Sequence, residues 1–447
     1  MSQTIITQIS DLSDPKYIGQ KITVLGYAQT VRRQTKKLCF VELKYGSDLI
    51  QVVIDDPKLT TGLTVQSYLK VVGTVVTTLK RSPPVEIQCT DFTILSRADP
   101  SYASECPSDA GPDIKLEKRH LYLRDPHFAL ITTVRAQLIE AIRKYFKKSK
   151  CLEIIPPSFT GVQCEGGASL FHVEHPSKST DKPMTAYLTQ SSQFALEMAL
   201  PGVGDCYCIA PSFRAEHSHT RRHLTEFLHA EAEWGGILTF DDHIKKLRDL
   251  LQGIVTFFLK IAKDTLKELE VYDRVVGLLE LTKDIMILTH KDAIVQLKEH
   301  EIYKDEETKT LFDERDDIPE AQERELIDKI GKIVFLVKFP EEFKSFYMAL
   351  DPDDPTRVLG CDVEVPGVGE IIGSGVREGH YERLHARLLK SGLKPDDYKE
   401  YLDLRKFGFG FTSGMGLGVD RMLTWLLGVH SIREVVTFPR FPGYLRP

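Results

Sequence analysis

The chain has 447 residues, of which 42% are hydrophobic and 27% charged, and its net charge is −6 at pH 7. This length and composition are typical of a soluble protein with two or three domains. No apolar run approaches the ~18 residues that a membrane span needs, and the N-terminus resembles neither a secretory signal nor a mitochondrial transit peptide. We therefore expect a cytoplasmic protein without a membrane association.

The negative total charge does not favour nucleic-acid binding, although such binding needs only local basic patches. Basic side chains cluster at two places, Arg32 to Lys37 and Arg143 to Lys150, and each cluster alone is more typical of a solvated face. The eight cysteines lack zinc-site spacing. We expect all of them to be reduced and structural, with Cys206 and Cys208 in a buried strand.

Residues from about 20 to 96 contain five short runs with strand character. ITVLGYAQTV alternates with period two, and LCFVEL and DLIQVVID are separated by the turn residues Tyr45, Gly46 and Ser47. YLKVVGTVV and VEIQCTDFTIL follow. Five strands in so short a stretch fit a small closed barrel, because closure protects the strand edges.

Residues 97–113 are rich in proline, serine and glycine, which is typical of a linker. Beyond it, helical periodicity over 128–148 predicts one apolar face made of Ile131, Val134, Leu138, Ile142 and Tyr145. A second amphipathic helix follows Asp241 and Asp242, with its inward face made of Ile244, Leu247, Leu251 and Ile254. Strands and helices do not alternate regularly in this part, so a parallel sheet is not expected.

The segment from Pro211 to Trp234 contains two strand-like pieces around a loop with arginines and histidines. A metal site of His217, His219 and His223 would need a carboxylate or thiolate at suitable spacing, and none is evident. Arginine binds phosphate oxygens in pairs through its planar guanidinium. The loop therefore favours a polyphosphate ligand.

Two further segments are suited to ligand binding. In Ser413 to Gly428, alternate glycines precede Arg421 at the start of an apolar helix, and they serve either close packing or a flat ligand. In Cys361 to Arg377, the side chains of Asp362 and Glu370 are suitable ligands for Mg²⁺. Taken alone, this acidic pair is more typical of strand-end surface residues.

Together these segments resemble a known family. RHLYLRDP with the following helix and IIPP, then FRAE…TRRHL, then GMGLGVDR occur in the order of the three signature motifs of class II aminoacyl-tRNA synthetases. The subgroup resembled is the one for aspartate, asparagine and lysine. The resemblance implies a multidomain α+β protein, with an OB-fold anticodon-binding domain (1–96), a linker (97–118) and a catalytic domain (119–447) that has a mainly antiparallel sheet flanked by helices.

The resemblance also assigns roles by motif position. Catalysis would depend on Arg214, at the α-phosphate of ATP, and on Arg421, which closes over an adenine stacked on Phe227. The implied ATP-binding residues are Arg214, Glu216, Arg222, His223, Phe227, Glu370, Gly418 and Arg421, and Asp362 and Glu370 would hold Mg²⁺. The implied amino-acid-binding residues are Glu165, Gln193, Leu196, Glu231, Ser374 and Arg377. Phe40 and Gln51 would contact an anticodon base, although a barrel aromatic is otherwise as often core, and Pro157 would lie in a homodimer interface.

The amino-acid substrate depends on a few residues, because the aspartate and asparagine members are similar. Aspartate members carry a lysine where this chain has Leu196, which leaves Arg377 as the cation for the substrate side chain. A buried carboxylate needs positive partners, whereas an amide needs one donor and one acceptor, for which Glu231 is the candidate. The words TRRHL, HAEAE, KSFYM and VGEIIGSG also resemble asparagine members. We therefore expect L-asparagine, ATP and tRNA(Asn) as partners.

Two segments depart from the asparagine pattern. A Pro-His-Gly triplet often precedes the glycine-rich strand, where this chain has Phe411, Thr412 and Ser413. EGHYERL follows Arg377 in place of a commoner continuation. The alternatives are an aspartyl-tRNA synthetase, discriminating or not, an asparagine synthetase on the same catalytic fold, and a silent RNA-binding relative. The last two are disfavoured, since the chain keeps both the barrel and the full set of charged motif residues.

Overall fold

The computed structural model describes residues 5–6, 9–78, 84–164, 169–177, 184–216 and 220–446. The chain forms two compact units, Met1–Leu130 with Pro447, and Ile131–Arg446. Their boundary lies inside helix α4 (Pro126–Lys148). Each unit is described separately.

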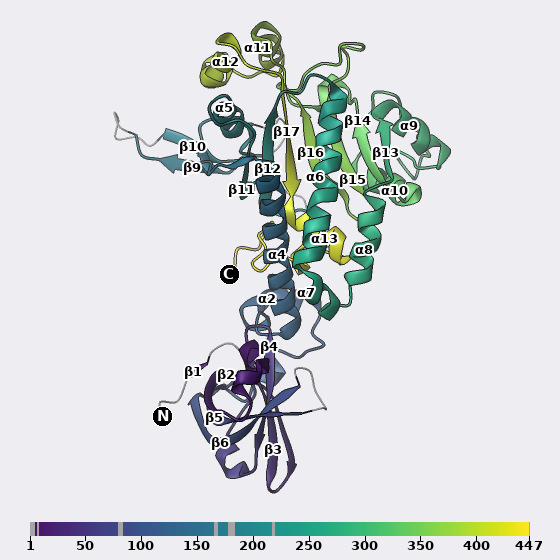
Figure 1. Ribbon diagram of the computed structural model, residues 1–447. Coiled ribbons are helices and arrows are strands. Elements are labelled where there is room, and N and C mark those ends of the chain that lie inside the picture. Colours follow the sequence, from purple (N-terminus) through teal and green to yellow (C-terminus); the bar gives the residue numbers. More distant parts are fainter. Residues whose placement is uncertain are drawn as a thin grey trace. The chain divides into compact units, whose positions relative to one another are not determined.

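The first unit is built on a closed barrel (Figure 1). Its strands are β1 (Ile5–Ile6), β2 (Lys21–Thr35), β3 (Leu38–Tyr45), β4 (Asp48–Ile54), β5 (Tyr68–Thr77) and β6 (Val85–Ser96). They pair in the order β1-β2-β3-β4-β6-β5, and an additional β2–β5 pairing closes the barrel. The predicted five-strand barrel is therefore confirmed, with β1 as a two-residue parallel addition to β2.

Alternation of buried and more exposed residues along a strand gives the barrel its core, and β3 shows it most clearly. Along β3, Cys39, Val41 and Leu43 are buried in the barrel core, while the intervening Phe40 and Glu42 are only half-buried. Single-turn 3₁₀ helices flank these strands at Ile9–Ser13, Pro15–Tyr17 and Pro57–Thr60. The segment predicted as a linker contains α1 (Tyr102–Glu105) and α2 (Pro112–Glu117), and α3 (Arg119–Tyr122) follows.

The second unit is built on an eight-stranded sheet in the order β13-β14-β15-β16-β17-β12-β11-β7. Its strands are β7 (Leu152–Glu153), β11 (Cys206–Phe213), β12 (Glu226–Gly235), β13 (Ile285–Thr289), β14 (Ile333–Val337), β15 (Gly360–Val365), β16 (Gly369–Val376) and β17 (Thr412–Gly418). All neighbours are antiparallel except β13–β14 and β7–β11. A small sheet pairs β8 (Phe159–Thr160), β10 (Met184–Leu188) and β9 (His172–His175). The expected mainly antiparallel sheet is confirmed.

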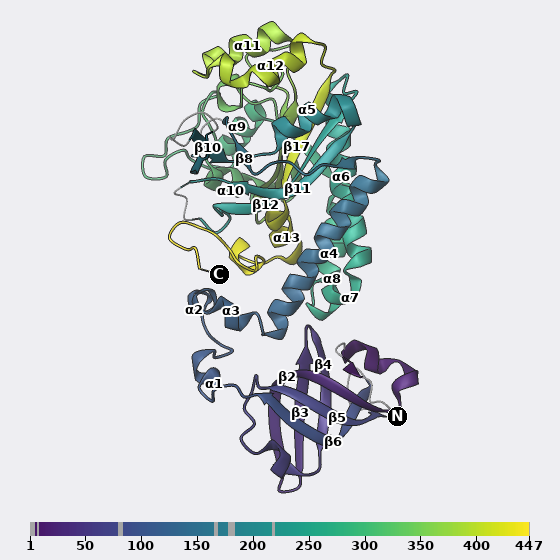
Figure 2. The ribbon, with the colours of Figure 1, turned by 90° about the vertical axis from the view of Figure 1, so that its left-hand side faces the viewer.

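Helices cover the large sheet. They are α5 (Gln193–Val203), α6 (Phe240–Ile261), α7 (Lys263–Glu268), α8 (Tyr272–Leu281), α9 (His290–Glu299), α10 (Glu320–Ile330), α11 (Tyr381–Lys390), α12 (Lys399–Lys406) and α13 (Val419–Leu427), with 3₁₀ turns at Glu341–Phe343, Pro395–Tyr398 and Ile432–Glu434. In Figure 1, α6 and α8 lie in front of the central strands, and in Figure 2 α4 runs beside α6. These helices and α13 share one apolar core with that face of the sheet.

Both predicted amphipathic helices are present. In α4, the residues Ile131, Val134, Leu138 and Ile142 are buried, while Tyr145 is half-buried. In α6, the four predicted inward residues are also buried. Helix α6 begins where it does because Thr239 and Asp242 form a reciprocal capping box, in which each side chain accepts a hydrogen bond from the other's backbone N–H.

Alternation along β12 separates core from pocket. Ala230, Ala232 and Trp234 belong to the core shared with α4 and α6. Because side chains alternate between sheet faces, His229, Glu231 and Glu233 point to the opposite face. On β17 the same register places Gly416 beside Glu231 and Gly414 beside Glu233. This face carries the polar pocket described below.

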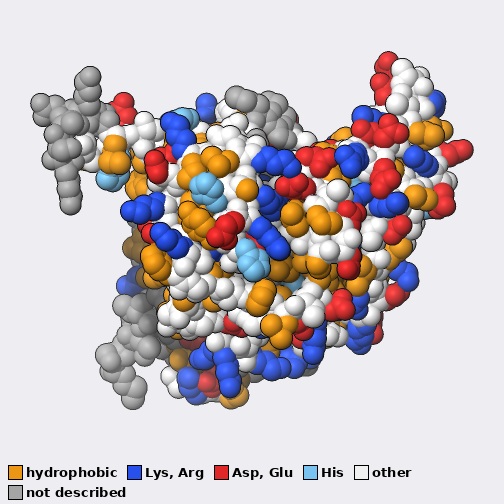
Figure 3. All heavy atoms as spheres, turned by 90° about the horizontal axis from the view of Figure 1, so that it is seen from above, with side chains coloured by type: hydrophobic (Ala, Val, Ile, Leu, Met, Phe, Trp, Pro, Cys, Tyr) orange, Lys and Arg blue, Asp and Glu red, His pale blue; other side chains and the backbone are white. Residues whose placement is uncertain are grey.

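The surface of the described residues mixes side-chain types. On the face in Figure 3, acidic, basic and hydrophobic side chains are interspersed among those drawn in colour. Within the described part of the chain, every helix is too short or too polar to cross a bilayer.

Candidate active site

Two cavities adjoin on the polar face of the large sheet. The Arg421 chamber is lined by residues that include Arg214, Glu216, Arg222, His223, Phe227, Glu370, Gly418 and Arg421. The Arg377 chamber is lined by residues that include Ser191, Gln193, Leu196, Glu231, Glu233, Tyr347, Ser374 and Arg377. Arg214, His229, Glu370 and Gly416 line both. The two chambers are therefore the ends of one pocket.

The Arg421 chamber brings together all eight residues that the sequence predicts to contact ATP. Arg421 lies in the first turn of α13, and its Nη1 donates to the backbone oxygen of Glu370 at 3.0 Å and to Glu370 Oε2 at 3.2 Å. Arg214 follows β11, and its guanidinium carbon lies 5.4 Å from the ring centre of Phe227. One guanidinium thus lies beside an aromatic ring and a second lines the same chamber, which suits a ligand with a flat ring and negative charge.

The loop between β11 and β12 adds Arg222 and His223 to this chamber. Arg222 Nη1 donates to the backbone oxygen of Val368 at 3.1 Å, and its Nε lies 3.1 Å from Glu320. Burial, together with the positive charges of Arg421 and Arg222, lowers the pKa of His223 to about 4. His223 is therefore neutral at pH 7. The other two histidines of the disfavoured metal site, His217 and His219, lie outside the described residues.

The predicted metal ligands Asp362 and Glu370 converge over Gly373. A Cβ built on Gly373 would lie 3.0 Å from Glu370 Oε1 and 3.8 Å from Asp362 Oδ1. Lys344 Nζ makes a short hydrogen bond to Asp362. Burial opposes ionisation of Glu370, but Arg421, Lys344 and Arg214 lower its pKa to about 2. Two carboxylates that face one spot, one of them held ionised, fit the oxygen ligands that Mg²⁺ prefers.

The Arg377 chamber contains Gln193, Leu196, Glu231, Ser374 and Arg377 as expected. Glu165, the sixth predicted amino-acid ligand, lies outside the described residues. Leu196 is 1% exposed and packs with Cys206 and Cys208. The chamber therefore has an apolar wall at the position where a lysine is expected in aspartate members of the family.

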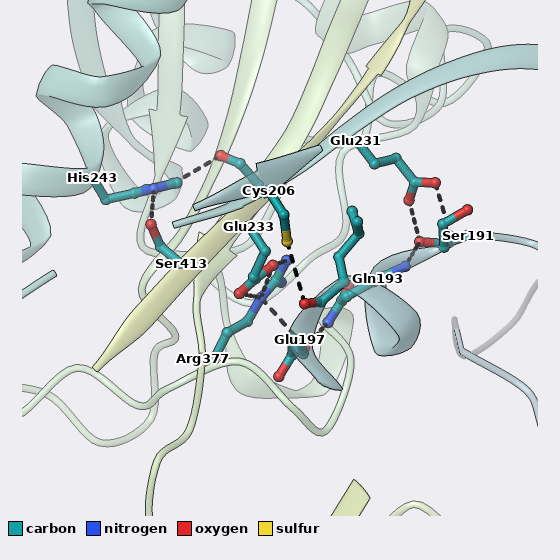
Figure 4. A network of polar contacts seen from close by, with 12 residues as sticks. Ser191, Gln193, Glu197, Cys206, Glu231, Glu233, His243, Arg377 and Ser413 are labelled. Carbon is teal, nitrogen blue, oxygen red and sulfur yellow. Dashed lines mark hydrogen bonds and ion pairs between the residues drawn. The ribbon is translucent and has the colours of Figure 1, made fainter. Parts of the chain in front are cut away.

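Glu233, rather than Glu231, lies against Arg377. Arg377 Nε and Nη2 donate to Glu233 Oε1 and Oε2 at 3.0 and 2.9 Å. Glu231 instead accepts from the backbone N–H of Ser192 at 2.8 Å and makes a short hydrogen bond with Ser191 (Figure 4). Burial works against the charged form of Arg377, but Glu233 and Glu197 raise its pKa above the ordinary range. Sequence reasoning missed Glu233, although it lies on the same face of β12 as Glu231.

A second buried ion pair lies behind Arg377, and the sequence did not reveal it. Glu197 on α5 lies 3.6 Å from Arg377 and 2.6 Å from Arg405 on α12. Tyr401 donates its hydroxyl to Glu197, with both carboxylate oxygens at 2.9 Å. In the sequence, the only indication that Glu197 lies near this chamber is its position directly after Leu196.

His243 on α6 is a further buried polar residue below the Arg377 chamber. Its Nδ1 lies 2.9 Å from Ser413 Oγ and its Nε2 lies 3.0 Å from Ser374 Oγ. Ser374 donates to the backbone oxygen of Cys361 at 2.6 Å. Because the Ser374 hydroxyl proton is used in this bond, Ser374 can only accept from His243. Nε2 of His243 must therefore donate to Ser374, and Nδ1 must accept from Ser413. Burial lowers the pKa of His243 to about 3, which keeps it neutral.

Two glycines of β17 make room for protein side chains. A Cβ on Gly414 would lie 1.9 Å from Glu233 Oε2, and one on Gly416 would lie 2.3 Å from His229 Nε2. A Cβ on Gly418 would lie 3.5 Å from Arg421, an ordinary contact. Close packing therefore explains Gly414 and Gly416, while Gly418 faces the Arg421 chamber.

The predicted interface residue Pro157 is exposed. Large apolar side chains near it are also exposed, with Leu152 at 51%, Ile155 at 95% and Phe159 at 53%. In the barrel, Phe40 is half-buried and lies under Arg32, whose guanidinium carbon is 6.0 Å from the ring centre. Gln51 donates to Glu86 at 2.8 Å. Since Glu42 pairs with Gln51 and Phe40 with Val53, Phe40 and Gln51 share one face of the sheet.

Two family models match this chain. The model for tRNA synthetases class II (D, K and N) matches residues 111–442, and the model for an OB-fold nucleic acid binding domain matches residues 22–95. The chain belongs to the class II tRNA synthetases of the D, K and N group.

Within this group, three similar proteins are asparagine enzymes. The cytoplasmic asparagine–tRNA ligase of Macaca fascicularis is 37% identical over 433 residues, which cover 95% of this chain and 75% of that protein. The asparaginyl-tRNA synthetase of Entamoeba histolytica in complex with asparaginyl-adenylate superposes with a TM-score of 0.87 at 29% identity, covering 100% of both chains. The enzyme of Pyrococcus horikoshii complexed with asparaginyl-adenylate gives 0.87 at 31% identity, covering 99% of this chain and 100% of that one.

Proposed function

We propose that this protein ligates L-asparagine to tRNA(Asn) in two steps, through an asparaginyl-adenylate, and releases pyrophosphate and AMP. In the first step the α-carboxylate of asparagine attacks the α-phosphorus of ATP and expels pyrophosphate. In the second step the terminal ribose 3′-hydroxyl of the tRNA attacks the acyl carbon. The observation that carries the choice of asparagine is the pairing of Arg377 with Glu233 beside the apolar Leu196.

The Arg421 chamber binds ATP in this proposal. Arg214 grips the α-phosphate, and the adenine lies between Phe227 and Arg421. No side chain becomes covalently attached, so the rate depends on holding the reactants in line and on neutralising phosphate charge. The neutral state of His223 at pH 7 is consistent with a hydrogen-bonding role near the outer phosphates rather than that of a further cation.

Asp362 and Glu370 hold Mg²⁺ in this proposal. The ion neutralises charge on the phosphates when it is bound. The two carboxylates fit because they converge over Gly373. Lys344 also donates a hydrogen bond to Asp362 and adds a positive charge beside this acid.

The Arg377 chamber selects the side chain of the amino acid. An amide offers one carbonyl oxygen and one NH₂ group, which match a guanidinium and a carboxylate that lie side by side. Glu233 is thus the nearer acceptor for the amide hydrogens, while Glu231, with Ser191 and Gln193, is turned to the part of the chamber that suits the α-amino group. A β-carboxylate would instead meet the acid Glu233 directly beside Arg377.

The remaining partners follow from the family. The barrel face that carries Phe40 and Gln51 reads the anticodon, and a base stacking on Phe40 fits its half-buried ring beside Arg32. The exposed apolar side chains around Pro157 support a homodimer interface there. The cytoplasmic names of eukaryotic relatives support a cytoplasmic location.

The test is ATP–pyrophosphate exchange with each of the twenty amino acids in turn, followed by charging of tRNA(Asn) transcript. We expect exchange with asparagine alone, because rejection through unmatched buried polar groups can reach about 10⁴-fold. Equal exchange with aspartate would contradict the proposal and favour an aspartyl-tRNA synthetase on the same scaffold.

A further inference from the structure

We propose that Glu197 and Arg405 act as a charge clamp behind the Arg377 chamber, which keeps the group of buried charges at net zero and thereby selects a neutral side chain. The inference rests on the proposed function and deepens it. It assigns two positioning residues that do not touch the substrate: among the described residues that line the Arg377 chamber, neither is present.

The contacts join four charged side chains in one row. Glu233 pairs with Arg377 through two hydrogen bonds, and Arg377 lies 3.6 Å from Glu197 (Figure 4). Glu197 in turn lies 2.6 Å from Arg405. The side chains of these four residues are at most 4% exposed. Water therefore contributes little screening, and the balance of charge within the row decides what a ligand meets.

Every oxygen of the two carboxylates in the row accepts at least one hydrogen bond. The two oxygens of Glu233 accept from Arg377. The two oxygens of Glu197 accept from Gln193, Tyr401 and Arg405 at 2.6 to 2.9 Å. Burial raises the pKa of Glu233 to about 7, while Arg377, through its charge and its two hydrogen bonds, acts in the opposite direction and favours the ionised carboxylate. Two guanidinium cations and two carboxylate anions sum to zero.

This sum sets the preference of the chamber. A side-chain amide adds no charge to the row, whereas a β-carboxylate adds a negative charge that neither arginine of the row is left to match. A buried charge without a partner is costly. Arg377 alone would attract a carboxylate, but the negative charges of Glu233 and Glu197 oppose that attraction. Arg405 balances the charge of Glu197, so that the row does not become net negative.

Glu197 has a second effect on the chamber. It accepts from Gln193 Nε2 at 2.8 Å, and Gln193 lines the chamber. Arg405 is in turn held by the backbone oxygen of Glu378, to which its Nε donates at 3.0 Å. A tether between α5 and α12 alone would not require charges, because a buried ion pair is seldom more stabilising than apolar residues of similar size.

The test varies the charge of the row in steps. Glu197→Gln makes it +1, Arg405→Gln makes it −1, and the double variant returns it to zero. For each purified full-length protein, kcat and KM of ATP–pyrophosphate exchange are measured with asparagine and with aspartate. Asp351→Asn is the matched control, since Asp351 is a buried carboxylate 2.8 Å from Lys338 and outside both chambers.

We expect the asparagine-to-aspartate ratio of kcat/KM to fall about 100-fold in Glu197→Gln, mainly through a lower KM for aspartate. In Arg405→Gln we expect weaker asparagine binding and no gain with aspartate. The double variant should regain a ratio within about tenfold of the unmodified protein, even if both activities are lower. Asp351→Asn should leave the ratio unchanged.

A constant ratio across all variants would overturn the clamp and leave only a structural tether. A double variant that stays as permissive as Glu197→Gln would overturn it too, because net charge would not then be the determinant. If the unmodified protein exchanges aspartate as readily as asparagine, the proposed function fails instead. Because the double variant restores charge balance, it keeps the test decisive where Arg405→Gln alone fails to fold.

Discussion

The two chambers of the pocket treat charge in opposite ways. In the Arg421 chamber, the Arg421 and Glu370 side chains are 19% and 36% exposed, and arginines outnumber acids among the predicted ligands. In the Arg377 chamber, the arginine is 4% exposed and both neighbouring acids already bind it. The first arrangement suits a ligand that brings negative charge. The second suits one that brings none.

Local sequence explains this difference. The charged residues Arg222 and Arg421 of the Arg421 chamber come from a loop and from the first turn of α13. In the Arg377 chamber, Arg377 at the end of β16 lies between Glu233 on β12 and Glu197 on α5, so these side chains meet each other. Charged side chains on a loop or at the start of a helix remain accessible to a charged ligand. Charged side chains between packed elements are buried and must be paired with each other.

Removing Arg214, the cation where the two chambers meet, should have the largest effect on activity. Arg214 lines both chambers, and Arg214→Ala removes the guanidinium that the proposal places on the α-phosphate. We expect pyrophosphate exchange to fall by about 10³-fold or more, because charge stabilisation in the transition state is lost. Circular dichroism and the melting temperature should stay close to the unmodified protein, since Arg214 packs at the pocket and not in the core. Normal exchange would refute the assigned role.

Glycine positions on β17 offer a smaller and more selective perturbation. In Gly416→Ala the new Cβ would lie 2.3 Å from His229 Nε2, whereas in Gly418→Ala it would lie 3.5 Å from Arg421. His229 is held by Ser212 at 3.1 Å and lines both chambers. We expect Gly416→Ala to lower kcat/KM for asparagine about 10- to 100-fold, because small misplacements are costly in a positioning enzyme.

Gly277→Ala serves as its control, because a Cβ there meets nothing within 4 Å and Gly277 lines neither chamber. This variant should change kcat/KM by less than about threefold. Both kinetic constants are measured by pyrophosphate exchange at saturating ATP. If Gly416→Ala keeps the kcat/KM of the unmodified protein, the contact of its Cβ with His229 does not disturb the site, contrary to the geometry.

What the sequence predicted well depends on the range of the interaction. Strands β2 to β6 and helices α4 and α6 follow from local periodicity, and the residues of the Arg421 chamber lie in three short motifs. Arg405 and Glu197 are far apart in the chain, and only the packing of α12 on α5 brings them together. Period-two alternation puts Glu231 and Glu233 on one face, but it cannot tell which of them Ser191 binds and which meets Arg377.

The smallest expected effect is the contribution of His243 to the pH dependence of stability, and its sign follows from the pKa of the buried ring. In the unfolded chain this histidine has its ordinary pKa of 6.5, while burial lowers the pKa in the folded state to about 3. Between these values the unfolded state holds more protons, so stability falls as the pH falls, by roughly 1.4 kcal/mol per pH unit. The slope that this histidine contributes fades as the pH rises above 6.5.

His243→Gln removes that contribution while keeping polar groups for Ser374 and Ser413. The free energies of unfolding of both proteins should be measured by urea titration at pH 6.0 and 5.0, following a signal of the second unit. The unmodified protein should lose about 1 kcal/mol more than the variant across this interval. The difference cancels other titrating groups, which both proteins share. An equal loss would mean that the ring becomes protonated without unfolding, and that the polar base of the Arg377 chamber is less closed to protons than its burial indicates.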